Sequence, residues 1–194
     1  MITVGNKESF ALESHIEAIS PNASQVALGF FVIHLQSKEF GVRKPDATML
    51  GCSIESVKER IQNRGRHLAP FGLELSAIAL AQSVVEVLYA DVREEEYFGI
   101  DTASFERILE DGRLLWAPDG DEAFDDGSKV IQYDDHGYVR LIGFRYDGDF
   151  RVNPESFAEV TISAEEYYGV LSQWVEQVMT EVGAMRIQAA GTGP

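Results

Sequence analysis

The chain of 194 residues carries 32 acidic and 16 basic side chains, a net charge of −16, and 45% of its residues are hydrophobic. This length and composition suit one globular domain with a core of its own, without a disulfide or metal to hold it together. The excess of acid argues against direct binding of nucleic acid, which takes clustered Lys and Arg. It favours a cationic partner instead.

The cysteine content and the apolar segments predict a cytoplasmic location. Cys52 is the sole cysteine, so an internal disulfide cannot form. Residues 1–12 lack the pattern of a signal peptide, and no apolar run reaches the roughly 18 residues that a membrane span needs. We therefore expect a protein of the reducing cytoplasm that does not associate with a membrane.

The acidic side chains are distributed unevenly along the sequence. Residues 91–126 carry 13 acids and 3 bases, a net charge of −10. Residues 1–90 carry 9 acids and 8 bases, and residues 127–194 carry 10 acids and 5 bases. The middle segment is therefore where a surface for a basic partner is expected, unless its charge serves solubility alone.

The first part of the chain is expected to form β-structure. Residues 10–17 alternate loosely between apolar and polar side chains, and residues 26–35 are rich in β-branched and aromatic ones. Both patterns favour strands. A turn at Ser37 would lead into residues 39–42 and complete a hairpin or meander.

Two helices are predicted next. Ser53 is expected to cap the first helix, and Gly65 is expected to end it. Residues 74–89 are predicted to form the central core helix, because apolar side chains recur at helical spacing. The side chains expected to be buried in this helix are those of Leu75, Ile78, Ala79, Ala81, Val85 and Leu88.

The region after residue 90 starts with an acidic segment that is expected to be irregular. Asp101 or Thr102 would then cap a short helix. Strands over residues 129–134 and 138–146 would form a hairpin with a tight turn between them. Residues 157–162 are expected to add another strand.

The C-terminal part predicts a long helix near residues 163–182. Ser163 and Glu166 form a capping-box pattern at its start. Residues 187–194 are expected to be a disordered tail, which leaves residues 1–186 as a single domain. Strands followed by helices, then strands and a helix, predict an α+β fold with a mostly antiparallel sheet packed against a few helices.

Little in the sequence points to catalysis. No Gly-rich phosphate loop and no nucleophile elbow is present in the sequence. The histidines lack a second His or Cys at metal-ligand spacing; they are His15, His34, His67 and His136. We therefore expect a binding protein without a cofactor or metal, and not an enzyme.

The most distinctive stretch is residues 116–128 (WAPDGDEAFDDGS), with five carboxylates in eight positions. It can be interpreted as a Ca²⁺ loop, as an anionic knob with a hydrophobic anchor, or as a solvated turn. The EF-hand spacing fails because Ala123 takes a ligand position. The candidate binding residues are the acids and aromatics of this stretch and of residues 94–97: Trp116, Asp119, Asp121, Glu122, Phe124, Asp125, Asp126, Glu94, Glu95, Glu96 and Tyr97.

Several stretches resemble the bacterial immunity protein 42 family. They are residues 4–13 (VGNKESFALE), 28–31 (LGFF), 40–43 (FGVR), 45–50 (PDATML) and the run 116–128, and the similarity extends over nearly the whole chain. Members of this family are cytosolic partners of the polymorphic toxins that bacteria use against one another. The resemblance implies a protein that binds a cognate toxin and blocks it. It supplies no contact residues, so the candidates above rest on charge and chemistry.

A nuclease toxin would fit the charge pattern, because the basic cleft that holds its nucleic acid would attract these carboxylates. The activity of the toxin stays open at this point, and so does the oligomeric state, monomer or homodimer. An acidic module that binds Ca²⁺ or another ligand is the main alternative. A small hydrolase is less favoured, because the sequence nominates no pair of nucleophile and base.

Overall fold

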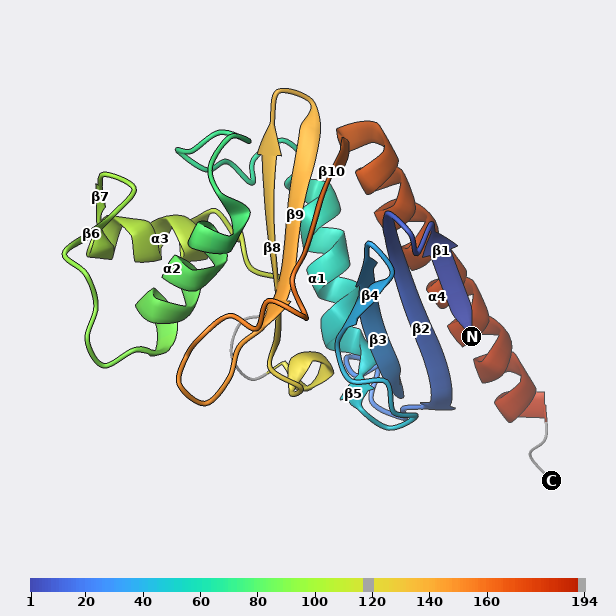
Figure 1. Ribbon diagram of the computed structural model, residues 1–194. Coiled ribbons are helices and arrows are strands. Elements are labelled where there is room, and N and C mark those ends of the chain that lie inside the picture. Colours follow the sequence, from blue (N-terminus) through green and yellow to red (C-terminus); the bar gives the residue numbers. More distant parts are fainter. Residues whose placement is uncertain (117–120, 192–194) are drawn as a thin grey trace.

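The computed structural model describes residues 1–116 and 121–191, which adopt the α+β fold that the sequence predicts (Figure 1). The first of two antiparallel sheets has the strand order β1-β2-β3-β4, and β5 also pairs with β3. Its strands are β1 (Ile2–Gly5), β2 (Phe10–Ile19), β3 (Ala27–Leu35), β4 (Lys38–Phe40) and β5 (Thr48–Met49).

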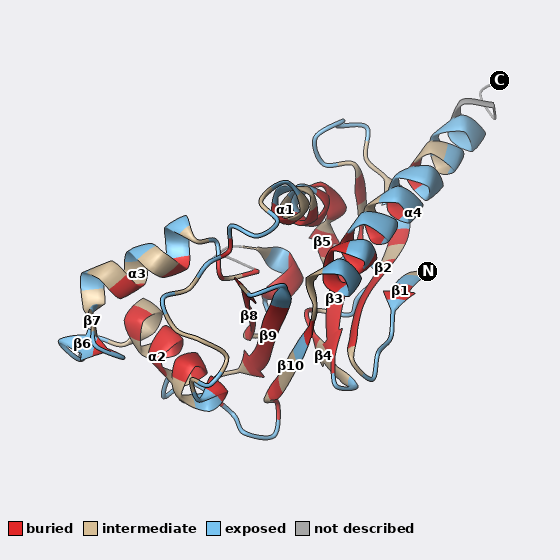
Figure 2. Ribbon diagram, turned by 90° about the horizontal axis from the view of Figure 1, so that it is seen from above, coloured by how far each residue is buried: buried red, intermediate tan, exposed pale blue. Residues whose placement is uncertain are grey.

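Two helices, α1 (Leu50–Gln62) and α4 (Ala164–Gly191), lie over one side of the sheets (Figure 2). Trp174 of α4 is in the middle of the core that they enclose. Its indole packs edge-on against Phe31 with ring centroids 5.0 Å apart, and its Nε1 donates a hydrogen bond to Ser14 Oγ at 3.1 Å. The indole N–H is thereby satisfied inside an apolar core.

The second sheet has the order β10-β9-β8, and its two longer strands, β9 and β8, are buried on both faces. Val139 and Leu141 of its middle strand belong to the same core as Trp174, whereas Ile142 and Phe144 belong to a second core. This alternation follows from the two-residue period of a strand. Its strands are β8 (Ser128–Asp135), β9 (Tyr138–Arg145) and β10 (Ala158–Ser163).

The second core lies between this sheet and the remaining helices. A two-stranded hairpin precedes the second of these helices, and a short 3-10 helix precedes β8. These elements are α2 (Ala77–Tyr89), β6 (Glu96–Tyr97), β7 (Ile100–Asp101), α3 (Thr102–Asp111) and η1 (Glu122–Phe124).

Several local predictions are confirmed. Asp101 caps α3 by accepting a hydrogen bond from the backbone N–H of Ser104 at 3.0 Å, and Ser163 caps α4 by accepting one from Glu166 at 3.1 Å. The turn between β8 and β9 places His136 at a φ of 44° and Gly137 at a φ of 86°. Positive φ at both turn residues is the geometry of a tight two-residue hairpin.

The predicted boundaries of the first and last helices are wrong. Helix α1 begins at Leu50, with Met49 as its N-cap and no side-chain cap, and Ser53 is buried within its first turn. Helix α4 runs to Gly191, so residues 187–191 are helical where a disordered tail was expected. No proline lies between Ala164 and Gly191, and the stop signals Gly191 and Pro194 come only at the end of the chain, so the helix continues past residue 182. The other tail residues, 192–194, lie outside the described part of the chain.

The buried face of α2 also differs from the prediction. The Ile78 side chain is 43% exposed, whereas those of Leu80, Val84 and Val87 are fully buried. Nearly every position from 77 to 89 is apolar or small, so the helical period alone does not reveal which side meets the sheet. The helix packs in the second core, and α1 takes the more central position beside both sheets.

A buried arginine joins α1 to the segment between α3 and β8. Arg60 is 3% exposed, and its guanidinium donates hydrogen bonds to the carbonyl oxygens of Arg113 and Leu115 and to the Gln132 side chain. Its Cζ lies 4.3 Å from the ring centroid of Trp116. Burial lowers the pKa of Arg60, and these neutral acceptors and the indole face compensate the charge.

The polar contacts of Arg60 continue into β8 and α4. Gln132 also accepts a hydrogen bond from the Tyr167 hydroxyl. The neighbouring Tyr168 hydroxyl donates to Asp134, with oxygen–oxygen distances of 2.9 and 3.0 Å to the carboxylate. This network links α1, β8 and α4 through several buried hydrogen bonds, although Arg60 Nε has no partner among the described residues, and it fixes the relative positions of the three elements.

A second polar cluster surrounds Glu13 on β2. The buried carboxylate accepts hydrogen bonds from Arg43 at 2.7 and 2.9 Å, from His34 at 2.8 Å, and from Lys7. Arg43 foremost, together with Lys7 and His34, keeps the pKa of Glu13 well below its ordinary value, against the opposing effect of burial. These contacts fasten the loop after β4 to the sheet, and Glu39 completes the Arg43 ion pairs.

In residues 1–116 and 121–191, no helix is both long enough and apolar enough to span a membrane. Helix α4 has the length, with 28 residues. Acidic side chains such as Glu176 and Glu181 interrupt its apolar positions.

Replacing Arg60 by Met tests the buried network. The substitution keeps an unbranched side chain, removes the Arg60 donor from two backbone carbonyls, and leaves the Gln132 oxygen with Tyr167 as its donor. We expect the free energy of unfolding to fall by about 2–4 kcal/mol in urea denaturation. Lys58→Met on the same helix is the control and should change it by less than about 0.5 kcal/mol. Unchanged stability of Arg60→Met would mean that desolvation of the guanidinium offsets all of its hydrogen bonds.

Candidate functional site

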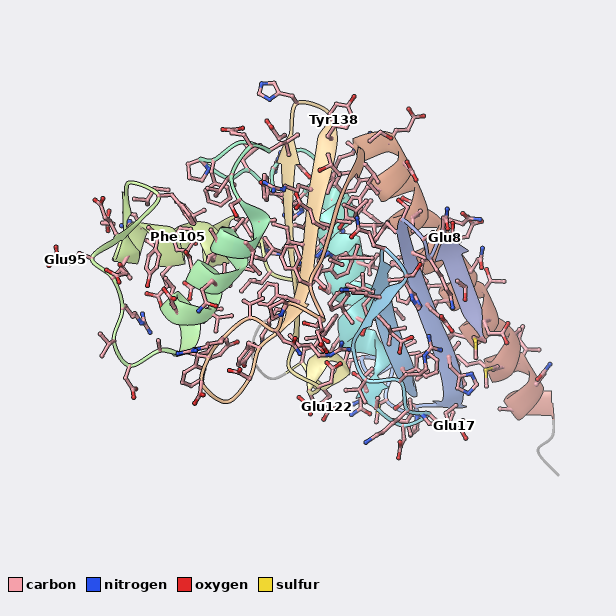
Figure 3. The ribbon with its side chains drawn as sticks, in the orientation of Figure 1. Glu8, Glu17, Glu95, Phe105, Glu122 and Tyr138 are labelled. Atoms are coloured by element: carbon pink, nitrogen blue, oxygen red, sulfur yellow. The ribbon has the colours of Figure 1, made fainter. Side chains whose placement is uncertain are left out.

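The acidic stretch 94–96 leads into the β6–β7 hairpin, where its three glutamates are exposed. Figure 3 shows Glu95 pointing away from the molecule. The next side chain, Tyr97, is only 6% exposed, and its ring stacks on Phe105 with centroids 5.5 Å apart. Tyr97 therefore belongs to the second core, and its contact with a toxin stays a prediction.

The exposed aromatic side chain of this hairpin is Phe98, which the sequence analysis missed. It is 39% exposed and contacts Phe71 and Phe105 with ring centroids 6.2 and 6.0 Å apart. Its backbone has a φ of 56°, followed by 76° at Gly99. A left-handed conformation costs a bulky residue roughly 1–2 kcal/mol, so the surroundings hold Phe98 in place. The sequence does place a Phe-Gly pair here, but the two strands on either side are only two residues long, so the sequence pattern did not reveal a hairpin.

The two aromatics of the 116–128 stretch are core residues. Trp116 is 1% and Phe124 is 5% exposed. Both rings contact Phe31 of β3, with centroids 6.1 and 6.3 Å apart. Large aromatic side chains next to carboxylates are still drawn into the core by the area that they bury. The role of Trp116 and Phe124 as anchors for a partner stays a prediction.

The acids of this stretch have different surroundings. Asp121 caps η1 by accepting the backbone N–H of Ala123 at 3.0 Å. Glu122 and Asp125 are exposed, and Asp126 pairs with Arg145 at 2.7 Å. The remaining candidate, Asp119, lies outside the described residues.

Two acids of this stretch have pKa values that move in opposite directions. Burial raises the pKa of Asp121, and the charges of Glu122 and Asp125 add to the effect. Burial acts on Asp126 as well, but hydrogen bonds from Ser128 and Arg145 outweigh it and lower the pKa. Asp121 therefore carries an incompletely compensated negative charge, whereas Asp126 is part of a compensated ion pair.

The structure separates the acidic segment into two places. Figure 3 shows Glu95 at the outer end of the second core and Glu122 beside η1, well apart from each other. The hairpin glutamates and the η1 carboxylates thus form two acidic surfaces. One contiguous patch, which the clustering in sequence suggested, is not present among the described residues.

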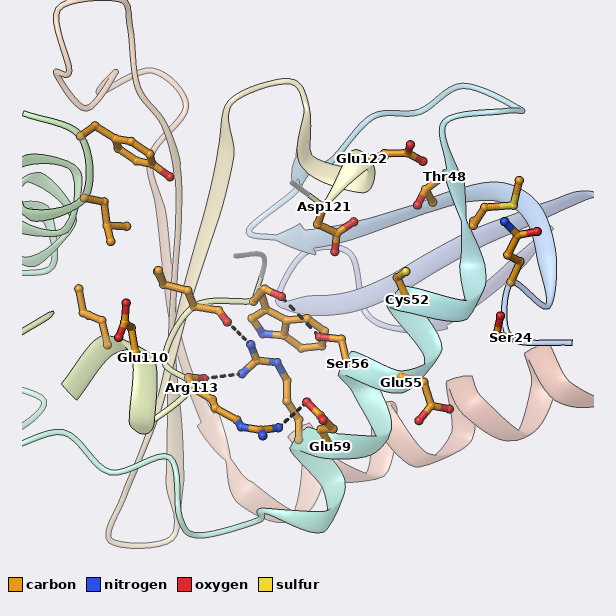
Figure 4. A pocket seen from close by; sticks show the side chains of 18 residues that line it. Ser24, Thr48, Cys52, Glu55, Ser56, Glu59, Glu110, Arg113, Asp121 and Glu122 are labelled. Carbon is orange, nitrogen blue, oxygen red and sulfur yellow. Dashed lines mark hydrogen bonds and ion pairs between the residues drawn. The ribbon is translucent and has the colours of Figure 1, made fainter. Parts of the chain in front are cut away.

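The η1 carboxylates border a cleft of about 1120 Å³ that the sequence did not reveal (Figure 4). Helix α1 lines it with Cys52, Glu55 and Glu59, and the end of α3 and the residues after it contribute Glu110 and Arg113. Asp121 and Glu122 line it from η1. Each of the helix acids resembles an ordinary solvated residue in the sequence, and only the fold brings them together.

The described residues include no group of three or more His, Cys, Asp or Glu side chains that could hold a metal ion. In the stretch considered for Ca²⁺, the carboxylates of Asp121 and Asp126 are engaged by backbone N–H groups or by Arg145.

The opposite pKa shifts of Asp121 and Asp126 give a test by urea denaturation. A raised pKa means that the ionised Asp121 destabilises the fold, so Asp121→Asn should stabilise it near neutral pH, by about 0.5 kcal/mol. Asp126→Asn should destabilise it by up to about 1 kcal/mol. Both differences should shrink as the pH falls through the pKa of the respective carboxyl group, because protonation makes Asp resemble Asn. The same sign for both variants would contradict this electrostatic description.

Comparisons with known proteins agree with the resemblance found in the sequence. A family model described as immunity protein 42 matches residues 1–177, and no curated protein matches the chain. The crystal structure of CdiI from Burkholderia dolosa AUO158 is similar in fold, with a TM-score of 0.57, 15% sequence identity, and coverage of 91% of this chain and 99% of that chain. The family model covers most of the sequence, so the chain is a member of the immunity protein 42 family.

Proposed function

We propose that this chain is a stoichiometric inhibitor that binds a cognate bacterial toxin in the cytoplasm and protects the producing cell. Membership of the immunity protein 42 family carries the proposal. An inhibitor of this kind needs no catalytic group and no cofactor. It does need tight binding, because a dissociation constant near nanomolar corresponds to about −12 kcal/mol.

The net charge of −16 favours a basic toxin surface. A nuclease fits best, because its active-site cleft is already positive in order to hold phosphates. Complementary charge raises association rates by about 10- to 10³-fold. The exposed carboxylates proposed for this role belong to the β6–β7 hairpin and to the region of η1: Glu94, Glu95, Glu96, Glu122 and Asp125.

Charge steers the encounter, whereas buried contacts set the lifetime of a complex. Phe98 is the aromatic side chain best placed for such a contact. It is partly exposed at the tip of an acidic hairpin, and its ring is already held by Phe71 and Phe105. A side chain fixed before binding loses little conformational entropy in the complex.

Neutralising the five exposed acids tests the electrostatic part of the proposal. The change to Gln or Asn should slow association by at least about tenfold at low salt and flatten its salt dependence. The measurement is stopped-flow binding to the C-terminal toxin domain encoded by the adjacent upstream open reading frame. The control variant neutralises five exposed acids elsewhere: Glu8, Glu17, Glu165, Glu176 and Glu181. Equal slowing in both variants would show that only total charge matters, and no slowing in either would remove charge from the mechanism.

Truncating Phe98 tests the proposed anchor. Phe98→Ala should raise the dissociation rate from the same toxin domain by about tenfold or more and leave association nearly unchanged. Val92→Ala is the control, because Val92 is 87% exposed near the same hairpin. A Phe98→Ala variant that folds normally and dissociates at the wild-type rate would contradict the anchor.

A further inference from the structure

The cleft beside η1 is large enough for more than one side chain. Its volume of about 1120 Å³ exceeds that of many sites for small ligands, which occupy about 300–1,000 Å³. Its walls come from both cores, with α1 on one side and the ends of α2 and α3 on the other (Figure 4). A short stretch of a partner chain fits this shape better than an isolated residue.

The lining of the cleft combines apolar and acidic groups. Leu88, Leu109 and Leu115 supply hydrophobic surface. Five of the lining residues are acidic and two are arginines, which leaves a net charge of −3. An apolar surface rimmed by carboxylates suits a lysine or arginine side chain, because its stem packs on the leucines while its head group pairs with the acids.

The two arginines of the lining are already engaged. Arg113 forms an ion pair with Glu59, and Arg60 is held by carbonyl oxygens and by Trp116. Within the described residues, no cation forms an ion pair with Glu110, Asp121 or Glu122. These three carboxylates are therefore available to a cation from outside.

The environment of Asp121 supports an external cation. Burial and the neighbouring acids raise its pKa, so the ionised carboxylate is disfavoured in the free protein. A positive charge placed in the cleft would remove this penalty, and the relief would add to the binding free energy.

We propose that this cleft receives a basic segment of the toxin, with arginine or lysine side chains that pair with Glu110 on the α3 wall and with Asp121 and Glu122 on the η1 wall. The proposal rests on the function proposed above and names the part of the surface that holds the partner. The exposed carboxylates of the β6–β7 hairpin and η1 would set the association rate. The cleft would set the dissociation rate and the specificity, because burying a cation without a carboxylate partner is strongly unfavourable.

Cys52 provides a test that needs no change in the cleft. It is exposed, lines the cleft from α1 and is the sole cysteine. Iodoacetamide should alkylate it at least about tenfold more slowly in the complex with the upstream-encoded toxin domain than in the free protein. The control chain carries Cys52→Ser and Ser172→Cys, which places the thiol on the exposed side of α4. Its alkylation rate should not change on binding.

Two adjacent charge reversals on α3 provide the second test. Glu110→Lys changes a residue of the cleft, whereas Asp111→Lys changes its exposed neighbour outside it. Both alter the net charge equally, so both should slow association to a similar degree. Only Glu110→Lys should raise the dissociation rate, by about tenfold or more.

The outcomes separate this proposal from the one on which it rests. If the toxin domain does not bind the unmodified chain, the proposed function fails, and the cleft proposal fails with it. If the domain binds but Cys52 reacts at its free rate, the cleft is not the contact surface, while the immunity function stands. Equal dissociation rates for the two charge-reversal variants would likewise overturn the cleft proposal alone.

Discussion

The structure depends on a positive charge that is held away from water. Removing a guanidinium from solvent costs several kcal/mol unless hydrogen bonds compensate it. Both terminal nitrogens of Arg60 are hydrogen-bonded, whereas its Nε has no partner among the described residues. The groups that contact the guanidinium therefore have little freedom to move. Those groups are the backbone of the segment after α3, the amide of Gln132 and the indole of Trp116. They connect α1 to the second sheet, and the cleft lies along this connection. The base of the proposed binding site is therefore rigid, and the carboxylates lie around its opening.

Local chemistry made much of the fold predictable. Strands such as β3 are recognisable from their β-branched and aromatic residues. The helix caps at Asp101 and Ser163 are also predictable, because each needs only one side chain and a backbone N–H close to it in sequence. Predictions failed where tertiary packing determines which residues are buried and where a helix begins. Ser53 could cap a helix in isolation, yet it is buried inside α1. Almost all of α2 is apolar, so its exposed face at Ile78 depends on where the sheet lies.

The candidate site was harder to predict, because nearness in sequence does not imply nearness in space. The charge count located an acidic segment, but it could not show that the aromatic residues within this segment pack in the two cores; they are Trp116, Phe124 and Tyr97. The cleft joins Glu55 of α1 with Glu110 of α3 and Glu122 of η1. No local pattern connects positions so far apart along the chain. Tertiary contacts bring α1 and the end of α3 together, among them the hydrogen bonds from Arg60 to the carbonyl oxygens of Arg113 and Leu115.

The position of the cleft between two cores has a thermodynamic consequence. One wall moves with the Trp174 core and the other with the core under α2 and α3. A ligand that touches both walls is lost when either core opens, so its binding free energy opposes partial unfolding as well as global unfolding. Occupancy would thereby add to the coupling that the shared sheet and the Arg60 contacts already provide between the two cores, and it would slow proteolysis through partly unfolded states for as long as the partner stays bound.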